Sequence, residues 1–224
     1  MKTLKTFLTC LALLIATFSF RSSAQTVTDI NLPGLKTNFN SKLGLTRIVF
    51  LGDPTCPGCI ASVADLKTLF NQCNNPDLRA MIVWIHVQGW SSVKSDAVTQ
   101  SASWTDSRVT FYWDSLWDIS YGFGYQGGWA GCNWAWDIQM IYTDTAKWNG
   151  TYPPAPFYCM SKTGCCNAYN STNLKNQLVN LGGCTASAIA EPYSQQKGLK
   201  VSPNPASRSV HLELPEIEIG RAHV

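Results

Sequence analysis

The chain has 224 residues, of which 45% are hydrophobic and 14% charged, and its formal net charge is +3. This composition excludes a disordered chain and suits one globular domain with extra segments at its ends. The basic residues are scattered along the sequence, which argues against a nucleic-acid partner.

Residues 1–24 have the pattern of a secretory signal peptide. Lys2 and Lys5 precede a mostly apolar segment at 7–20, and the small residues at 22–24 offer a cleavage site. The apolar segment is short for a membrane-spanning helix, and no later segment is long and apolar enough to span a bilayer. We therefore expect a secreted or cell-surface protein that passes through the periplasm and has no membrane span after cleavage.

Apolar runs and helical spacings alternate through a predicted domain at 43–184, which follows a lead-in at 25–42 without predicted elements. Alternation of strands with helices predicts a mainly parallel sheet covered by helices. In chain order, the pattern predicts a strand at 46–51, a helix from 59 that stops at 74–76, a strand at 81–87 and a helix at 91–103. A strand at 109–113, a short helix at 117–121 and an antiparallel strand pair at 138–142 and 157–160 follow. The closing helix is predicted at 173–181, with Ser171 or Thr172 as its cap.

Two cysteines stand where the first predicted strand passes into the first helix, in Thr55-Cys56-Pro57-Gly58-Cys59. Free N–H groups at a helix N-terminus stabilise a thiolate at Cys56, Pro57 suits the first helical position, and Gly58 leaves the sulfur open. Cys59 would then attack a mixed disulfide and release the product. The pattern predicts thiol–disulfide exchange with Cys56 as nucleophile and Thr55, Pro57 and Gly58 as the active-site loop.

Other interpretations of this Cys-x-x-Cys pattern stay open. Half of a zinc site and a structural disulfide show the same spacing, but His86 is the single histidine of the predicted domain, so we expect no metal site and no cofactor. A non-enzymatic module that binds a soft metal or another ligand is one alternative function. An extracellular structural domain held by disulfides is another.

Exchange through a buried second cysteine benefits from a carboxylate that moves protons. Asp53 and Asp137 are the main candidates, and Asp114 is a third. Each of them is also typical of a turn or a helix cap, so the sequence does not choose among the three.

The remaining cysteines of the predicted domain form an even set, which suits an oxidising compartment. They are Cys73, Cys132, Cys159, Cys165, Cys166 and Cys184, and six cysteines allow 15 pairings. Because a bond between adjacent residues is strained, we expect Cys165 and Cys166 to have different partners. In an alternative arrangement, these two and Met160 meet the dithiol as a soft-metal or second redox site.

The Cys-Pro-Gly-Cys position, the element order and the stretch 114–123 resemble the thioredoxin fold of periplasmic thioredoxin-like reductases and peroxiredoxins over residues 43–183. The resemblance implies an α/β three-layer sandwich with a central mixed sheet, and disulfides or thiols of proteins or small molecules as substrates. Two positions depart from that family. Residues 132–137 contain no proline where the family has a cis proline, and Thr55 stands where a tryptophan is usual.

A different resemblance marks the C-terminus. Pro203-Asn204-Pro205-Ala206 and the alternating strand after it resemble the start of the C-terminal sorting domain of type IX secretion cargo, although a turn before an ordinary strand shows the same pattern. The resemblance implies a linker at 185–199, a truncated sorting domain at 200–218 and the type IX secretion machinery as a partner. Residues 219–224 resemble a translated sequencing adapter, so we expect a fragment whose last two dozen residues are poorly ordered.

Overall fold

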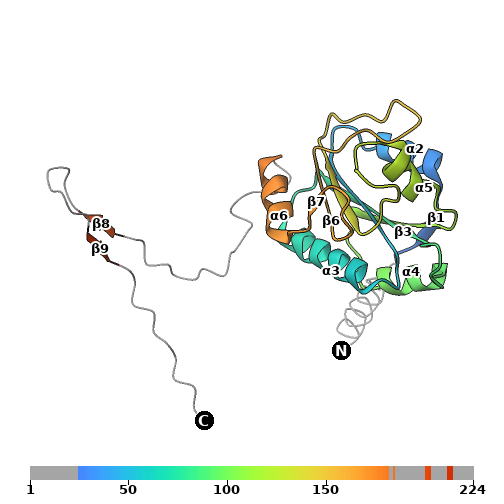
Figure 1. The fold of residues 1–224 in the computed structure, drawn as a ribbon, viewed down its shortest axis with the longest axis horizontal. Coiled ribbons are helices and arrows are strands. Elements are labelled where there is room, and N and C mark those ends of the chain that lie inside the picture. The colour runs from blue at the N-terminus through green and yellow to red at the C-terminus, as the bar shows by residue number, and fades with distance from the viewer. Residues whose placement is uncertain (1–24, 182–183, 185–199, 203–210, 214–224) are drawn as a thin grey trace, which may run out of the picture.

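The computed structural model describes residues 25–181, 184, 200–202 and 211–213 (Figure 1). The predicted signal peptide, the linker and most of the predicted sorting segment lie outside the described residues. The helices are α2 (Leu32–Asn40), α3 (Pro57–Gln72), α4 (Lys94–Ser101), α5 (Asp118–Tyr121) and α6 (Ser171–Asn180), with a π-helical turn η1 (Gly122–Gln126) after α5. In the described part of the chain, no helix is long and apolar enough to cross a membrane.

Strands β1 (Val27–Asp29), β2 (Thr46–Gly52), β3 (Leu78–Ile85), β4 (Val109–Asp114), β5 (Ile138–Tyr142), β6 (Tyr158–Ser161) and β7 (Asn167–Ala168) form one sheet in the order β1-β4-β3-β2-β5-β6-β7. Strands β1, β4, β3 and β2 run parallel, whereas β5 is antiparallel to both β2 and β6. The predicted α/β architecture with a central mixed sheet flanked by helices is confirmed. Strands β8 (Lys200–Ser202) and β9 (His211–Glu213) form a separate antiparallel ladder.

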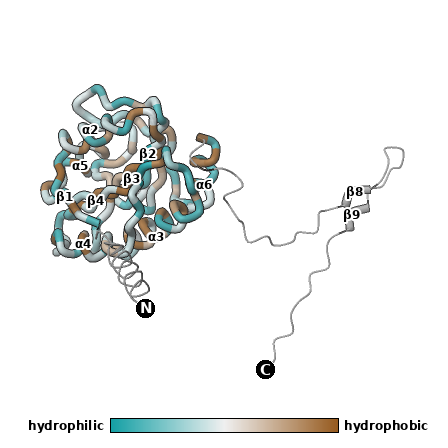
Figure 2. Tube along the Cα trace, turned by 180° about the vertical axis from the view of Figure 1, so that it is seen from behind, coloured by the Kyte–Doolittle hydropathy of each residue, from teal (hydrophilic) through white to brown (hydrophobic). Residues whose placement is uncertain are grey.

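The central strands are buried on both faces, which explains their continuous apolar sequence. Because successive side chains of a strand point to opposite faces, Ile48 and Phe50 of β2 join one hydrophobic cluster and Val49 and Leu51 join the other. In Figure 2, the hydrophobic colour accordingly runs through the strands in the middle of the molecule. Two separate hydrophobic layers therefore hold the helices to the sheet.

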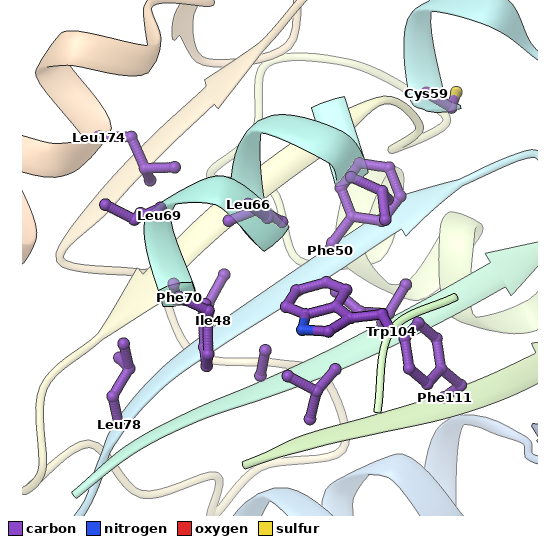
Figure 3. Close-up of a cluster of buried hydrophobic side chains, with 14 of the residues drawn as sticks. Ile48, Phe50, Cys59, Leu66, Leu69, Phe70, Leu78, Trp104, Phe111 and Leu174 are labelled. Atoms are coloured by element: carbon purple, nitrogen blue, oxygen red, sulfur yellow. The ribbon is translucent and has the colours of Figure 1, made fainter. Parts of the chain in front are cut away.

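One of these layers lies under α3, α4 and α6. Leu66, Leu69 and Phe70 of α3 recur at helical spacing and point towards the sheet, where they meet Ile48 and Phe111 (Figure 3). Helices α2 and α5 and the turn η1 cover the opposite face. Figure 1 shows α3 and α4 on the side of the sheet away from α2 and α5.

Several boundaries differ from the sequence prediction. The lead-in, where no element was predicted, contains β1 and α2, and the side chain of Asn31 caps α2 by accepting a hydrogen bond from the Gly34 amide at 2.9 Å. Helix α6 begins two residues earlier than predicted. Its cap is Asn170, which accepts from the Asn173 amide at 3.0 Å, rather than Ser171 or Thr172.

Three disulfides link the six cysteines of the described residues that lie outside the dithiol. They join Cys73 to Cys184, Cys132 to Cys165, and Cys159 to Cys166. The prediction that the adjacent Cys165 and Cys166 bond to different partners is confirmed. The alternative in which these two cysteines and Met160 meet the dithiol is wrong, because both sulfurs are already bonded elsewhere.

A buried arginine connects the lead-in to the sheet. The Arg47 side chain is fully buried, and its guanidinium donates to the carbonyls of Phe39 at 3.2 Å, Ala146 at 2.8 Å and Asp144 at 3.3 Å. The same guanidinium lies 4.2 Å from the centre of the Phe39 ring. Arg47 thus supplies donors to carbonyls at the end of α2 and in the partly buried segment after β5.

We expect Arg47→Met to lower the free energy of unfolding by about 3 kcal/mol, because it leaves one buried and two partly buried carbonyls without their donor. Urea denaturation followed by circular dichroism measures this change. The control is Lys94→Met, which breaks the exposed ion pair with Asp29 at 2.7 Å and should cost less than about 1 kcal/mol. Equal effects of the two substitutions would contradict the role assigned to Arg47.

Candidate active site: a dithiol beside Asp137

The dithiol lies at the N-terminus of α3, just beyond the carboxyl end of β2. Cys56 is the N-cap of α3 with an extended backbone, Pro57 is the first helical residue, and the Cys59 amide donates to Cys56 Sγ at 3.3 Å. The sulfur of Cys56 therefore takes the place of the side-chain oxygen that usually caps a helix. This is the strand-to-helix junction that the sequence predicts.

The two cysteines differ in exposure. Both are free thiols, and Cys56 is 7% exposed whereas Cys59 is fully buried. Cys59 belongs to the hydrophobic cluster beneath α3 and lies at one end of it in Figure 3. A Cβ atom at Gly52 would lie 3.0 Å from Cys59 Cβ, so the lack of a side chain at Gly52 lets the end of β2 approach the first turn of α3.

Asp137 brings a carboxylate to the two sulfurs. It is the residue before β5, and the pairing of Ile138 with Leu51 places the start of β5 beside the end of β2. One carboxylate oxygen of Asp137, Cys56 Sγ and Cys59 Sγ all lie within 4.8 Å of one another, and all three residues are buried. Asp137 has a φ of 44°, in the left-handed region, which aspartate adopts more readily than most residues other than glycine.

A hydrogen bond holds one oxygen of the Asp137 carboxylate, and the other oxygen faces the space beside the dithiol. Ser62 Oγ, one turn into α3, donates to Asp137 Oδ1 at 2.8 Å. The other oxygen, Oδ2, lies against Gly58, where a Cβ atom would be 2.9 Å from Oδ2 and 3.7 Å from Cys56 Sγ. Gly58 thus leaves space shared by the carboxylate and the first sulfur.

The turn between β6 and β7 supports Asp137 from outside. The Lys162 amide donates to the Asp137 carbonyl at 3.3 Å, and Lys162 Nζ donates to the Gly58 carbonyl at 3.0 Å. Thr163 Oγ1 donates to the carbonyl of Trp136 at 2.8 Å. The Cys132–Cys165 disulfide also joins this turn to the segment before β5. The backbone around Asp137 is therefore linked to the turn by a covalent bond as well as by hydrogen bonds.

Burial dominates the electrostatics of the site. Burial raises the pKa of the Cys59 thiol far above its usual range, and the Asp137 charge and the hydrogen bond with Cys56 raise it further. Burial also raises the pKa of Asp137, against the opposing effects of the Ser62 hydrogen bond and the Lys162 charge. Both groups therefore hold a proton more firmly than they would in water.

The other carboxylate candidates have different surroundings. Asp53 is fully buried and accepts from the Thr55 amide at 2.8 Å, the Val87 amide at 3.1 Å and Ser92 Oγ at 2.6 Å. It therefore connects the loop before Cys56 to the segment after β3. His86 also contacts Ser92, through Nδ1 at 3.1 Å from the Ser92 carbonyl.

Asp114, at the end of β4, caps α5. Its carboxylate accepts from the Leu116 amide at 2.9 Å and the Ile119 amide at 3.1 Å. Burial, with a smaller contribution from the neighbouring Asp118, raises the pKa of Asp114 to about 7. Within the described residues, the Asp137 carboxylate joins the two sulfurs in a group of candidate ligand atoms, whereas the carboxylates of Asp53 and Asp114 do not.

Sequence reasoning missed Ser62 and Lys162, and it did not predict the contact between Trp136 and Trp90. Ser62 follows Cys59 by three residues on a helix, so helical spacing alone places it on the same face. No comparable signal marks Lys162, because its position depends on the β6–β7 turn. Trp136 packs edge-on against Trp90 with ring centres 5.7 Å apart, and Trp90 is 37% exposed.

Comparisons with known proteins give similarities of structure only. No family model matches the chain, and no curated protein matches it in sequence. The dsbF protein of MTB, in its mixed oxidized and reduced forms, is similar with a TM-score of 0.42 and 12% identity, over 71% of this chain and 97% of that chain. A thiol:disulfide interchange protein of the thioredoxin family from Chlorobium tepidum is similar with a TM-score of 0.41 and 12% identity, over 70% of this chain and 96% of that chain.

A secreted Mycobacterium tuberculosis disulfide oxidoreductase homologous to E. coli DsbE gives a TM-score of 0.37 and 13% identity, over 73% of this chain and 100% of that chain. Identities this low assign neither a family nor an activity to the chain.

Proposed function

We propose that the protein is an exported thiol–disulfide oxidoreductase that works through Cys56 and Cys59, with Asp137 as the proton-transfer group. One observation carries this proposal: two free thiols at a helix N-terminus lie within 4.8 Å of a buried carboxylate oxygen. The six other cysteines of the predicted domain are already paired, which leaves this dithiol as the reactive pair of the described residues.

The first step is attack by the Cys56 thiolate on a substrate disulfide. A bond forms between Cys56 Sγ and one substrate sulfur, the substrate disulfide breaks, and the second substrate sulfur leaves as a thiolate. Cys56 takes this role because it is the more exposed cysteine and because its sulfur lies at the N-terminus of α3, where it accepts a hydrogen bond from the Cys59 amide. Exposed Thr55 and Pro57 flank the approach.

The second step needs a proton acceptor, because the buried Cys59 thiol holds its proton firmly. The Asp137 carboxylate takes that proton, and the Cys59 thiolate attacks Cys56 Sγ. The Cys56–Cys59 disulfide forms as the mixed disulfide breaks, and the substrate sulfur that was bonded to Cys56 leaves as a thiolate that takes up a proton. Reversal of both steps would oxidise a substrate dithiol instead, so the same residues serve either direction.

Other residues of the site act as positioning residues. Ser62 orients the carboxylate through Oδ1, and Lys162 holds the Asp137 and Gly58 carbonyls. Asp53 holds the loop in front of Cys56 through its bonds to Thr55, Val87 and Ser92. We assign Asp53 this supporting role rather than proton transfer, since its oxygens are already engaged.

The place of action that we propose is the cell surface or the extracellular medium, reached through the periplasm and the type IX secretion machinery. The signal-like N-terminus and the Pro-Asn-Pro-Ala segment at 203–206 support this route. Three disulfides in one small domain also suit an oxidising compartment. Disulfides or thiols of proteins or small molecules are the proposed substrates.

We expect Cys56→Ser to abolish insulin reduction by the full chain with dithiothreitol as electron donor, because the attacking sulfur is lost. Cys59→Ser should instead accumulate a mixed disulfide at Cys56, which mass spectrometry detects as an added substrate mass. Cys10→Ser, outside the described residues and the predicted mature chain, is the matched control. Insulin reduction that survives Cys56→Ser would refute the proposed role.

Asp137→Asn removes the proton acceptor and keeps the size of the side chain. We expect the release of a trapped mixed disulfide to slow by about 100-fold or more at neutral pH. In the wild type, this rate should rise with pH until Asp137 has lost its proton, which its raised pKa places above the usual carboxyl range. In the variant, the rate should keep rising at higher pH, because solvent must then remove the Cys59 proton.

Stopped-flow measurement of mixed-disulfide release across pH tests this prediction. The control is Asp77→Asn, an exposed aspartate in the turn before β3. Identical pH profiles for the wild type and Asp137→Asn would show that Asp137 does not move the proton.

A further inference from the structure

We propose that the reduced dithiol and Asp137 form a binding site for one zinc ion. The site uses Cys56 Sγ, Cys59 Sγ and Asp137 Oδ2 as ligands. It goes beyond disulfide exchange and does not require that activity, because it depends only on where three side chains meet.

The spacing of the three ligand atoms fits a single small cation. Zinc–sulfur bonds of about 2.3 Å at a tetrahedral angle place two thiolates roughly 3.8 Å apart. The two sulfurs and one carboxylate oxygen of Asp137 already lie within 4.8 Å of one another. Closure around an ion therefore needs the distance between the two sulfurs to shorten by about 1 Å at most.

The two oxygens of Asp137 have separate tasks in this arrangement. Oδ1 accepts the 2.8 Å hydrogen bond from Ser62, whereas Oδ2 faces the space beside Gly58 and Cys56 Sγ. A metal-bound carboxylate is typically oriented by such a hydrogen bond to its other oxygen. Ser62 therefore directs Oδ2 towards the ion before the ion binds.

The charges near the site also favour a divalent cation. Two thiolates and a carboxylate carry three negative charges, and a divalent ion leaves one. Lys162 Nζ, bonded to the Gly58 carbonyl at 3.0 Å, and the N-terminus of α3 lie on the same side and offset the remaining charge. Three buried anions without a cation would be far more costly.

The mixture of sulfur and oxygen donors selects the class of metal. Copper(I) prefers sulfur ligands alone, and magnesium and calcium prefer oxygen alone, whereas zinc accepts cysteine and aspartate together. Three protein ligands leave the fourth coordination position of the zinc ion free for water or a small thiol. Cys56, with 7% of its surface exposed, is the ligand next to solvent. An ion held here keeps both sulfurs reduced, so zinc binding competes with formation of the Cys56–Cys59 disulfide.

The test is zinc titration of the full chain under anaerobic conditions, against a chelator of known affinity. Mild reduction should open Cys56–Cys59 alone, and alkylation with peptide mapping checks that the other three disulfides are intact. We expect one zinc ion per reduced chain and none per oxidised chain. Cys56→Ser and Cys59→Ser should each abolish stoichiometric binding.

Substitutions around the carboxylate separate a three-ligand site from a simple dithiolate. We expect Asp137→Asn to weaken zinc binding by at least tenfold, and Ser62→Ala to weaken it by about 10–100-fold through loss of orientation. Asp77→Asn, far from the dithiol, should bind as the wild type does. Circular dichroism checks that each variant is folded.

Zinc affinity unchanged by Asp137→Asn would overturn the site, as would equal binding by the oxidised chain. Copper(I) bound more tightly than zinc, with no effect of Asp137→Asn, would also overturn it in favour of a pure dithiolate. The insulin assay in metal-free buffer tests exchange separately. Exchange without stoichiometric zinc refutes only this inference, and zinc binding without exchange refutes only the proposed function.

Discussion

The antiparallel pairing of β5 with β2 is the constraint on which the site depends. Strand β2 leads into the dithiol at its carboxyl end, and β5 starts directly opposite, with Ile138 paired to Leu51. The residue before β5 must therefore lie next to the residues after β2. A shift of this register by one residue would turn Asp137 to the other face of the sheet and remove the carboxylate from the sulfurs.

The site combines groups whose charged forms are costly to bury. Cys59 and Asp137 are both enclosed, and one positive side chain, Lys162, lies near them. Such an arrangement is stable when protons neutralise the acids, and it is also stable when a cation replaces those protons. Proton transfer during exchange and binding of an ion are thus two outcomes of the same buried charges.

The sequence predicts the central sheet well because its strands are buried on both faces and read as continuous apolar runs, as in β2. Strand β1 escapes prediction because it has only three residues, and α2 contains Pro33 and Gly34 in its first turn. The dithiol is recognisable from spacing and local order alone. The choice of Asp137 over Asp53 and Asp114 is not, because it follows from strand pairing between residues far apart in the chain.

The adjacent cysteines after β6 carry a consequence for how the chain matures. Cys165 and Cys166 bond to Cys132 and Cys159, so an exchange of partners between neighbours produces an isomer with every sulfur still paired. Loop lengths in the two isomers differ by a single residue, so chain entropy hardly distinguishes them. The native folded packing must make the distinction, including the left-handed backbone of Cys166 at a φ of 61°. Oxidation of this hairpin before β5 and β6 have paired would therefore yield both isomers, and correct maturation requires the sheet to form first.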